Sequence, residues 1–300
     1  MSATVRYEEI TCRSAMNRVS GMPFRWSLNP YRGCVHGCHY CFARRFHAYF
    51  DLNAGDDFTS IIFVKTNVGR VLREELSLRS WRREMVSVGT ATDPYQPIEG
   101  KYRLTRTCLE AFADWSSPMT LVTKGTMVVR DVDVLAELSR RAECTVCFSI
   151  ITTDPQLART LEPGTPPPAK RFEALRRLTD AGVNAGVLLA PVLPGITDDK
   201  ANIESVVREA SDSGARFLSA TMLNLKPGTK EHYLEFVEAK YPHLAADYGR
   251  LFQGAYAPAW LQTDMRRRVA QVKAGFGMAE RPNRAEREPA EPQQLGLALA

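Results

Sequence analysis

The 300-residue sequence has no apolar run near the ~20 residues that a membrane-spanning helix requires. Residues 1–18 are mixed and polar and lack the apolar centre of a secretory signal. The excess of positive charge is only +5, which permits an anionic partner such as nucleic acid but does not indicate one. These absences predict a cytoplasmic protein that does not interact with membranes.

Cysteine is too scarce and too unevenly placed for a disulfide framework. The chain has seven cysteines, an odd number, and three of them lie between positions 34 and 41. Small secreted folds instead distribute an even number of cysteines along the chain. The remaining four cysteines are scattered, so the cluster of three is the feature that needs a chemical explanation.

Six short apolar segments alternate with amphipathic stretches whose apolar residues recur every three or four positions. The segments are dense in Val, Ile, Leu and Met on both faces, as buried parallel strands require. The predicted strands are Trp26–Leu28, Met85–Gly89, Met119–Thr123, Thr145–Ile151, Gly186–Ala190 and Phe217–Met222. The predicted helices are Leu104–Asp114, Asp131–Arg141, Ala169–Ala181, Asp199–Ala210 and Thr229–Tyr241. This alternation predicts an α/β fold with a parallel sheet and right-handed crossovers.

Three segments do not fit this repeat. The apolar run Ile61–Val64 could be an extra strand or part of the first crossover. Residues 1–24 show no clear periodicity and are interpreted as an N-terminal leader segment before a core domain at 25–260. Residues 261–300 are interpreted as a C-terminal helix followed by a disordered tail, because 280–300 are rich in Pro, Glu, Arg and Gln.

Cys34, Cys38 and Cys41 have the spacing C-x3-C-x2-C. Three thiolates this close can bind three irons of one [4Fe–4S] cubane, and the fourth iron then has no protein ligand. An open iron is what an enzyme needs if a small molecule must bind the metal. One alternative is a structural zinc site, completed by His36 or His39, in a non-catalytic protein. Another is a simple iron–sulfur electron-transfer protein.

The segment Asn29–Phe42, with the aromatic Tyr40 before the last cysteine, resembles the signature of the radical S-adenosylmethionine (SAM) superfamily. Within that superfamily the chain resembles the spore photoproduct lyase-like branch. The segments that carry this second resemblance are Gly89–Glu99, Thr123–Lys124, Phe148–Ile150 and Ala190–Asp198.

The resemblance implies a partial (β/α)6 TIM-like barrel. It also implies a [4Fe–4S] cluster on Cys34, Cys38 and Cys41, with SAM bound to its open iron. Reductive cleavage of SAM would give a 5′-deoxyadenosyl radical that abstracts hydrogen from an unknown substrate, with nucleic acid as the first candidate. A one-electron reductant such as flavodoxin or ferredoxin is the implied partner.

The unusual polar residues fall where an α/β barrel places its functional groups, at the carboxyl ends of the strands. The six predicted strands are followed, or ended, by Cys34–Cys41, Thr90–Asp93, Lys124, Ser149, Pro191–Asp198 and Asn224–Lys226. A solvated surface would not concentrate polar residues at one end of every strand.

The resemblance also implies individual roles. Tyr40 would lie against the adenine of SAM, and it is the candidate for a catalytic side chain. Further cofactor contacts would come from Thr90, Thr92, Asp93, Lys124, Ser149, Pro194 and Gly195. Among these, Lys124 would pair with the SAM carboxylate, and Pro194-Gly195 would border the adenine. The alternatives are a turn at Asp93, a surface lysine, a strand serine without a ligand, and a tight turn at Gly195.

The match to the lyase itself fails at two positions. The lyase has a hydrogen-donating cysteine where this chain has Thr90, and a tyrosine where it has Phe42. An alcohol O–H bond is much stronger than a thiol S–H bond, so Thr90 cannot replace that cysteine. Cys147 could face the barrel interior, because it lies two residues before Ser149. Arg82-Arg83 beside Trp81 is either part of a solvated surface or a phosphate-binding group at the barrel mouth.

Overall fold

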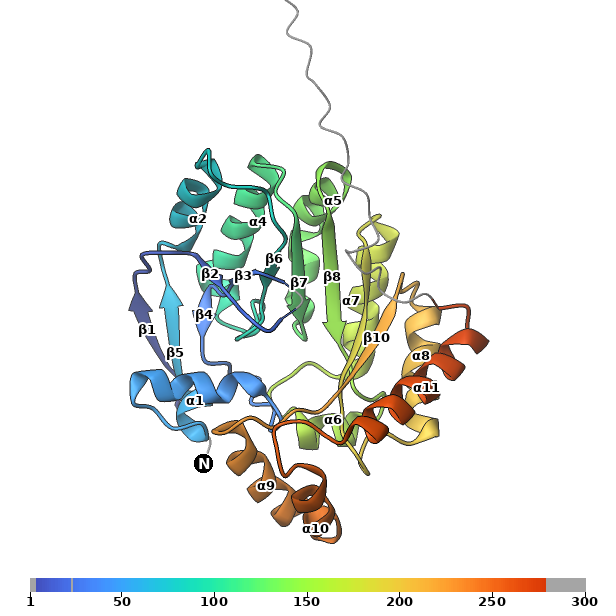
Figure 1. Ribbon diagram of the computed structural model, residues 1–300. Coiled ribbons are helices and arrows are strands. Elements are labelled where there is room, and N and C mark those ends of the chain that lie inside the picture. Colours follow the sequence, from blue (N-terminus) through green and yellow to red (C-terminus); the bar gives the residue numbers. More distant parts are fainter. Residues whose placement is uncertain (1–3, 23, 279–300) are drawn as a thin grey trace, which may run out of the picture.

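The computed structural model describes residues 4–22 and 24–278, and its centre is a seven-stranded sheet (Figure 1). The strand order is β10-β9-β8-β7-β6-β3-β2, with every neighbouring pair parallel except β2 and β3. The strands are β2 (Met16–Arg18), β3 (Trp26–Leu28), β6 (Val86–Val88), β7 (Met119–Thr123), β8 (Cys144–Ser149), β9 (Ala185–Val192) and β10 (Leu218–Met222). All six predicted strands are therefore confirmed, and their parallel order matches a partial barrel.

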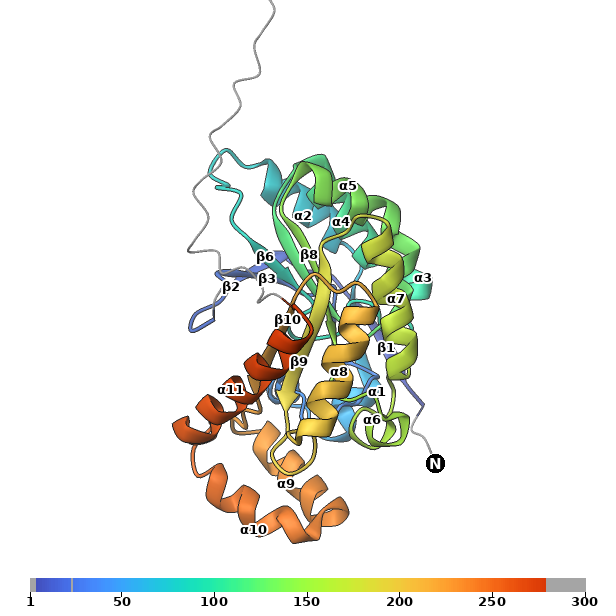
Figure 2. The ribbon, with the colours of Figure 1, turned by 90° about the vertical axis from the view of Figure 1, so that its right-hand side faces the viewer.

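Helices cover the outer face of this sheet, as Figure 2 shows from the side. They are α4 (Leu104–Asp114), α5 (Val132–Arg141), α7 (Pro168–Asp180) and α8 (Lys200–Asp212). Their predicted apolar faces are buried; in α8, for example, Ile203, Val206 and Val207 have no exposed surface. The side chain of Asp199 accepts a hydrogen bond from Asn202 N (2.9 Å) and so caps the start of α8.

A second sheet has the strand order β1-β5-β4, in which β4 and β5 belong to the first crossover, between β3 and β6, and β1 comes from the N-terminal segment. Its strands are β1 (Arg6–Ile10), β4 (Tyr31–Arg32) and β5 (Ile61–Lys65). The same crossover contains the 3-10 helix η1 (Phe42–Phe50) and the helices α1 (Asp56–Ser60) and α2 (Val68–Ser77). The apolar run Ile61–Val64 is thus both an extra strand and part of the first crossover.

The two chain ends pack onto the central domain. β1 and β2 lie within the predicted leader segment, where β1 pairs with β5 and β2 pairs with β3. At the other end, α11 (Ala259–Gly275) begins before the predicted boundary at 261 and packs against α8 and β10. The predicted boundaries at 24 and 260 therefore do not coincide with a break in packing. The predicted tail, 280–300, lies outside the described residues.

The remaining helices lie at or near the carboxyl ends of the strands. They are α3 (Glu99–Tyr102), the 3-10 helix η2 (Thr126–Asp131), α6 (Pro155–Leu161), α9 (Thr229–Lys240) and α10 (Pro242–Leu251). In Figure 1, α6, α9 and α10 lie below the central sheet. No helix in the described part of the chain is long and apolar enough to span a membrane.

Candidate functional site

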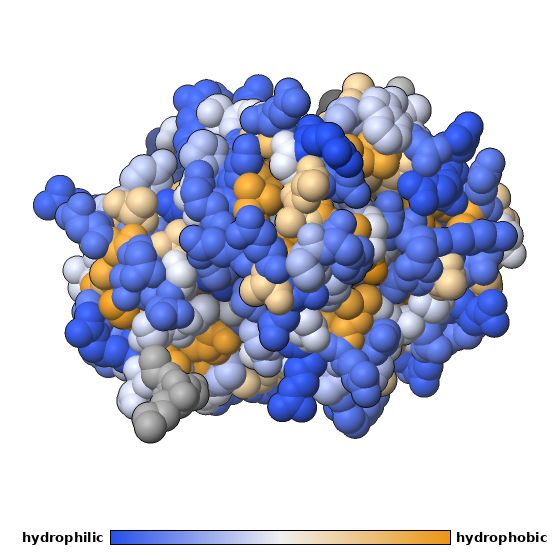
Figure 3. Space-filling view, turned by 90° about the horizontal axis from the view of Figure 1, so that it is seen from below, coloured by the Kyte–Doolittle hydropathy of each residue, from blue (hydrophilic) through white to orange (hydrophobic). Residues whose placement is uncertain are grey.

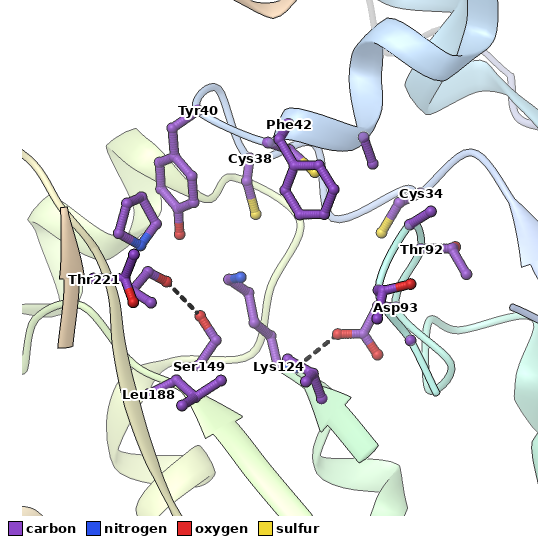
Figure 4. Close-up of a pocket in the computed structure, with 18 of the residues that line it drawn as sticks. Cys34, Cys38, Tyr40, Phe42, Thr92, Asp93, Lys124, Ser149, Leu188 and Thr221 are labelled. Atoms are coloured by element: carbon purple, nitrogen blue, oxygen red, sulfur yellow. Dashed lines mark hydrogen bonds between the residues drawn. The ribbon is translucent and has the colours of Figure 1, made fainter. Parts of the chain in front are cut away.

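A cavity of about 340 Å³ opens at the carboxyl ends of the strands of the central sheet. This volume is within the range of small-molecule sites. Its wall includes most of the residues predicted from the sequence, namely Cys34, Cys38, Cys41, Tyr40, Thr90, Thr92, Asp93, Lys124 and Ser149. Residues from loops far apart in the sequence therefore meet in one pocket (Figure 4).

The cysteine loop is held by its own backbone turns and by one buried arginine. Gly37 N donates to Cys34 O (3.3 Å), and Cys41 N donates to Cys38 O (3.2 Å). The guanidinium of Arg44, which is 2% exposed, donates to Cys38 O (2.9 Å) and to Gly37 O (2.8 Å). This bracing fixes the loop, and Figure 4 shows the sulfur atoms of Cys34 and Cys38 directed toward the pocket.

The chemistry of the three thiols fits an iron–sulfur cluster. Burial raises the pKa of Cys38 and of Cys41, so the thiolate form is disfavoured in the absence of nearby positive charge. Metal ions provide that charge and deprotonate a coordinating thiol. Three sulfur donors on the wall of one cavity are therefore suited to ligate irons of one cluster.

Neither histidine of the loop is arranged as a fourth metal ligand. Nδ1 of the buried His36 lies 3.3 Å from Asp93 Oδ2. Burial alone would lower the pKa of His36, but the charges of Asp93 and Cys34 outweigh it and raise the pKa to about 10. His39 does not line the pocket; it stacks on Phe236, with ring centroids 4.0 Å apart. The geometry therefore gives no support to a Cys3His zinc site.

Asp93 and Thr92 line the pocket, but their polar atoms contact the surrounding loops. Asp93 Oδ1 accepts hydrogen bonds from Thr123 Oγ1 (2.7 Å) and Tyr95 N (2.8 Å), and Oδ2 accepts one from Lys124 N (2.6 Å). Thr92 Oγ1 donates to the carbonyl of the residue before Cys34 (2.6 Å). Asp93 thus forms the turn considered as its alternative role, and direct contacts of these two residues with SAM stay predictions.

Lys124 projects into the pocket beside a buried acid that the sequence did not reveal (Figure 4). Its Nζ lies 3.9 Å from Oε1 of Glu162, and the Tyr40 hydroxyl donates a hydrogen bond to the same oxygen. Arg171 forms an ion pair with the other oxygen of Glu162 at 2.5 Å. Burial lowers the pKa of Lys124, but the charges of Cys38 and Glu162 outweigh it, so that the net shift is upward. The nearby carboxylate of Glu162 therefore favours the ammonium form of Lys124.

Residues 28–207 match the profile of the radical SAM superfamily. This chain belongs to that superfamily. The uncharacterized protein Rv2578c of Mycobacterium tuberculosis is 38% identical over 292 residues, covering 95% of this chain and 86% of the relative. A radical SAM Nalpha-GlyT isomerase of Pseudomonas phage M6 is 27% identical over 56% of this chain and 33% of its own length.

The solved structure of spore photoproduct lyase complexed with dinucleoside spore photoproduct has a TM-score of 0.68. It covers 90% of this chain and 79% of the lyase chain at 15% identity, which establishes a shared fold. The predicted partial barrel is thereby confirmed. The protein is a radical SAM enzyme, and the cofactors of its superfamily are a [4Fe–4S] cluster and SAM.

Two further predictions for the radical SAM pocket differ from the structure. Pro194 and Gly195 lie outside it and line a second cavity of about 290 Å³ with residues of α10. Pro191, from the same segment, lines the cysteine pocket instead. The loop after β9 turns away from the pocket, and the hydroxyl of Tyr248 donates to Pro194 O (2.9 Å). Pro194 and Gly195 thus do not line the cysteine pocket, and a contact of theirs with the adenine stays a prediction.

Arg82 and Arg83 also lie away from the radical SAM pocket, at the other end of the central sheet. Trp81 packs against Trp26 at the start of β3, with ring centroids 5.6 Å apart, and donates to Ser117 Oγ (3.2 Å) just before β7. The pair therefore lies near the amino ends of the strands, opposite the pocket, and cannot bind phosphates at its mouth. Cys147 is fully buried and does not line the pocket.

Several residues that support the pocket wall from behind could not have been found by motif or periodicity. Glu162 follows α6, and Arg171 lies within α7, so neither belongs to a strand end. Gln96 is fully buried and accepts a hydrogen bond from Val35 N (3.2 Å) in the cysteine loop. The one available signal was its position in the segment Gly89–Glu99, which carried part of the resemblance.

Proposed function

We propose that Cys34, Cys38 and Cys41 ligate three irons of the [4Fe–4S] cluster and that SAM occupies the cavity beside them. When bound, the cluster would supply one electron for the reductive cleavage of SAM, and the radical chemistry so provided would remove a hydrogen atom from the substrate. The observation that carries this proposal is that three thiols, two of them buried, and the ammonium of Lys124, whose side chain is 17% exposed, share one cavity of about 340 Å³.

The side chains around this cavity would bind and orient SAM. Lys124 places a positive charge opposite the SAM carboxylate, where low solvent exposure strengthens the attraction. Tyr40 offers its ring to the adenine, and it stays the candidate for a catalytic side chain. Ser149 donates its hydroxyl to Ala190 O (3.0 Å), so its accepting lone pairs remain for a ligand donor. Thr90, Thr92 and Asp93 form the wall that closes the pocket after β6.

The apolar part of the wall would exclude water from a reactive radical. Met22, Phe24 and Phe42 line the cavity, together with Leu188 and Met222. A dry site prevents side reactions of the radical with solvent. On the face seen in Figure 3, apolar side chains lie in recesses among polar ones.

Nucleic acid is our first candidate for the substrate. Phe42, Phe46 and Tyr49 follow one another along η1 outward from the pocket, with ring centroids 6.2 and 6.1 Å apart. Arg45 lies over the ring of Phe46 at 5.6 Å. Exposed aromatic rings with neighbouring arginines are suited to stacking unpaired bases. The dinucleoside bound by the structurally similar spore photoproduct lyase supports the same candidate.

The test is anaerobic reconstitution of three proteins: the wild type, Cys38→Ser, and Cys12→Ser as a matched control. Cys12 lies in the N-terminal segment outside the pocket lining. With flavodoxin, ferredoxin or dithionite as reductant, the wild type and Cys12→Ser should bind about four irons and convert SAM to 5′-deoxyadenosine. Cys38→Ser should lose both properties, and a Cys38→Ser protein with a full cluster and SAM cleavage would refute the ligand assignment.

The substrate candidate needs its own experiment. Single-stranded DNA and RNA with deuterated nucleosides would be added to the reconstituted enzyme, SAM and reductant. Transfer of deuterium into 5′-deoxyadenosine is expected from at least one of the two polymers. If SAM is cleaved but no polymer transfers deuterium, the nucleic-acid assignment is wrong although the radical SAM assignment stands.

A further inference from the structure

Glu162 is a buried carboxylate that no motif or comparison assigns to the site. Its side chain is 1% exposed and lies directly after α6. One of its oxygens, Oε1, is shared by two residues of the pocket wall, the hydroxyl of Tyr40 and the ammonium of Lys124. Tyr40 and Lys124, both candidate SAM contacts, therefore share one carboxylate oxygen.

The carboxylate is fixed from its other side by an arginine. Arg171, also 1% exposed, pairs with Oε2 at 2.5 Å. Its remaining donors bind Pro166 O (2.8 Å) and Ser149 O (3.0 Å), so the guanidinium cannot turn away. A buried charge without a partner costs several kcal/mol, and Arg171 offsets that cost. Oε1 is therefore held in place for the two pocket residues.

The segment that carries Glu162 also supports the cysteine loop. His39 N donates to Leu161 O (3.1 Å), and Gly164 N donates to His36 O (3.0 Å). A side chain at Gly164 would place a Cβ only 2.2 Å from Val35 O, so the two backbones approach as closely as glycine allows. Glu162 is consequently positioned relative to the cysteines as well as to Lys124.

We propose that Glu162 is a positioning residue for SAM binding, which presents the Lys124 ammonium and the Tyr40 ring to the cofactor in one fixed arrangement. This inference rests on the proposed function. If the anion is removed, the buried Arg171 and the partly exposed Lys124 lose their shared counter-charge. Lys124 then moves away or loses its proton, and the SAM carboxylate loses its partner.

The experiment measures the dissociation constant of SAM for the reconstituted protein, using the change in the electron paramagnetic resonance spectrum of the reduced cluster. Glu162→Gln keeps the size of the side chain and should weaken SAM binding about 10-fold, the usual cost of losing a residue that supports a ligand. Its iron content should equal that of the wild type.

Asp131→Asn is the matched control. Asp131 is also fully buried, pairs with Arg130 at 2.9 Å and accepts a hydrogen bond from a tyrosine, Tyr95 (2.9 Å). It does not line the pocket. Its substitution should leave the dissociation constant of SAM unchanged. Equal weakening in both variants would mean that Glu162 acts only through overall stability, and the inference would be overturned.

A double-mutant cycle tests the path through Lys124. Lys124→Met should weaken SAM binding at least as much as Glu162→Gln, and the double variant should be little worse than Lys124→Met alone. Fully additive costs, or wild-type affinity in Glu162→Gln, would overturn the inference. If Glu162→Gln does not fold, Glu162→Asp replaces it in the cycle; it keeps the charge but withdraws it by one methylene group, and the same outcomes decide.

The result for the wild type distinguishes a failure of the proposed function from a failure of the role proposed for Glu162. If its spectrum does not respond to SAM at all, the proposed function fails, whatever the variants do. If the wild type responds and Glu162→Gln matches it, only the role of Glu162 is refuted.

Discussion

The molecule contains two buried charged clusters that are built from the same kinds of residue. In the pocket cluster, Glu162 accepts a hydrogen bond from Tyr40 and pairs with Arg171, next to Lys124. In a second cluster, which we call the helix cluster, Glu99 accepts a hydrogen bond from Tyr31 and pairs with Arg130 at 2.8 Å. Each cluster therefore has a tyrosine hydroxyl and an arginine on one buried carboxylate.

The two clusters differ in what else reaches the carboxylate. Glu99 also accepts hydrogen bonds from Thr105 N (3.0 Å) and Arg106 N (3.3 Å), and so it satisfies the first turn of α4. Glu162 is approached instead by the ammonium of Lys124, at 3.9 Å, which is too long for a hydrogen bond. In the helix cluster, backbone and side-chain donors of the fold occupy the carboxylate of Glu99. In the pocket cluster, the ammonium of Lys124 remains available to a ligand.

The largest expected effect comes from breaking the helix cluster. Glu99→Gln removes the charge on a buried acceptor of several hydrogen bonds, while Arg130 keeps Asp131 as a partner. Because each hydrogen bond to a charged group is worth roughly 1.5–3 kcal/mol, the free energy of unfolding should fall by about 4 kcal/mol. Urea unfolding of the cofactor-free protein would measure this loss. The SAM affinity of the reconstituted, folded variant should equal that of the wild type. A loss below about 1 kcal/mol, or weaker SAM binding, would contradict the distinction between the two clusters.

A second lysine sharpens the comparison, because its surroundings differ from those of Lys124. Lys65, at the end of β5, is 3% exposed, and burial together with the charge of Arg32 lowers its pKa from 10.5 to about 8. Between these values the unfolded chain binds more protons than the folded one. Stability should therefore rise with pH across this range by roughly 3 kcal/mol on account of Lys65.

The measurement compares urea unfolding of the wild type and Lys65→Met at intervals from pH 7 to pH 10. Other titrating groups are common to both proteins, so the difference between the two curves reports Lys65. The wild type should gain stability relative to Lys65→Met as the pH rises above about 8. A constant difference across the range would show that Lys65 is not held in a desolvated position.

The central sheet was predictable from the sequence because its strands are short apolar segments that repeat with helices between them. The two N-terminal strands were harder to predict, because β1 and β2 have exposed residues and little periodicity. The pairing of β1 with β5 joins segments about 55 residues apart, and no local pattern encodes such a path. The predicted leader segment therefore became part of two sheets.

In the candidate site, too, some residues could be predicted from the sequence and others could not. Residues at strand ends, such as Cys34 and Lys124, were found because the fold class fixes where strand ends meet. Glu162 was missed because it lies 122 residues from Tyr40 and its loop has no regular structure of its own. That Pro194 and Gly195 line a second cavity could not be predicted, because the direction of the loop after β9 depends on its packing against α10.

The smallest expected effect is a difference between substitutions of Tyr40 in the pocket cluster and Tyr31 in the helix cluster. Tyr40→Phe and Tyr31→Phe each remove one hydroxyl that donates to a buried carboxylate, so each should lower the free energy of unfolding by about 1 kcal/mol. Only Tyr40 lines the pocket. Of the two variants, Tyr40→Phe alone should therefore alter the paramagnetic resonance spectrum of the SAM-bound, reduced cluster. Both variants keep the aromatic ring and differ only in which carboxylate loses a hydrogen-bond donor. An altered spectrum in Tyr31→Phe would therefore show that the helix cluster also shapes the pocket.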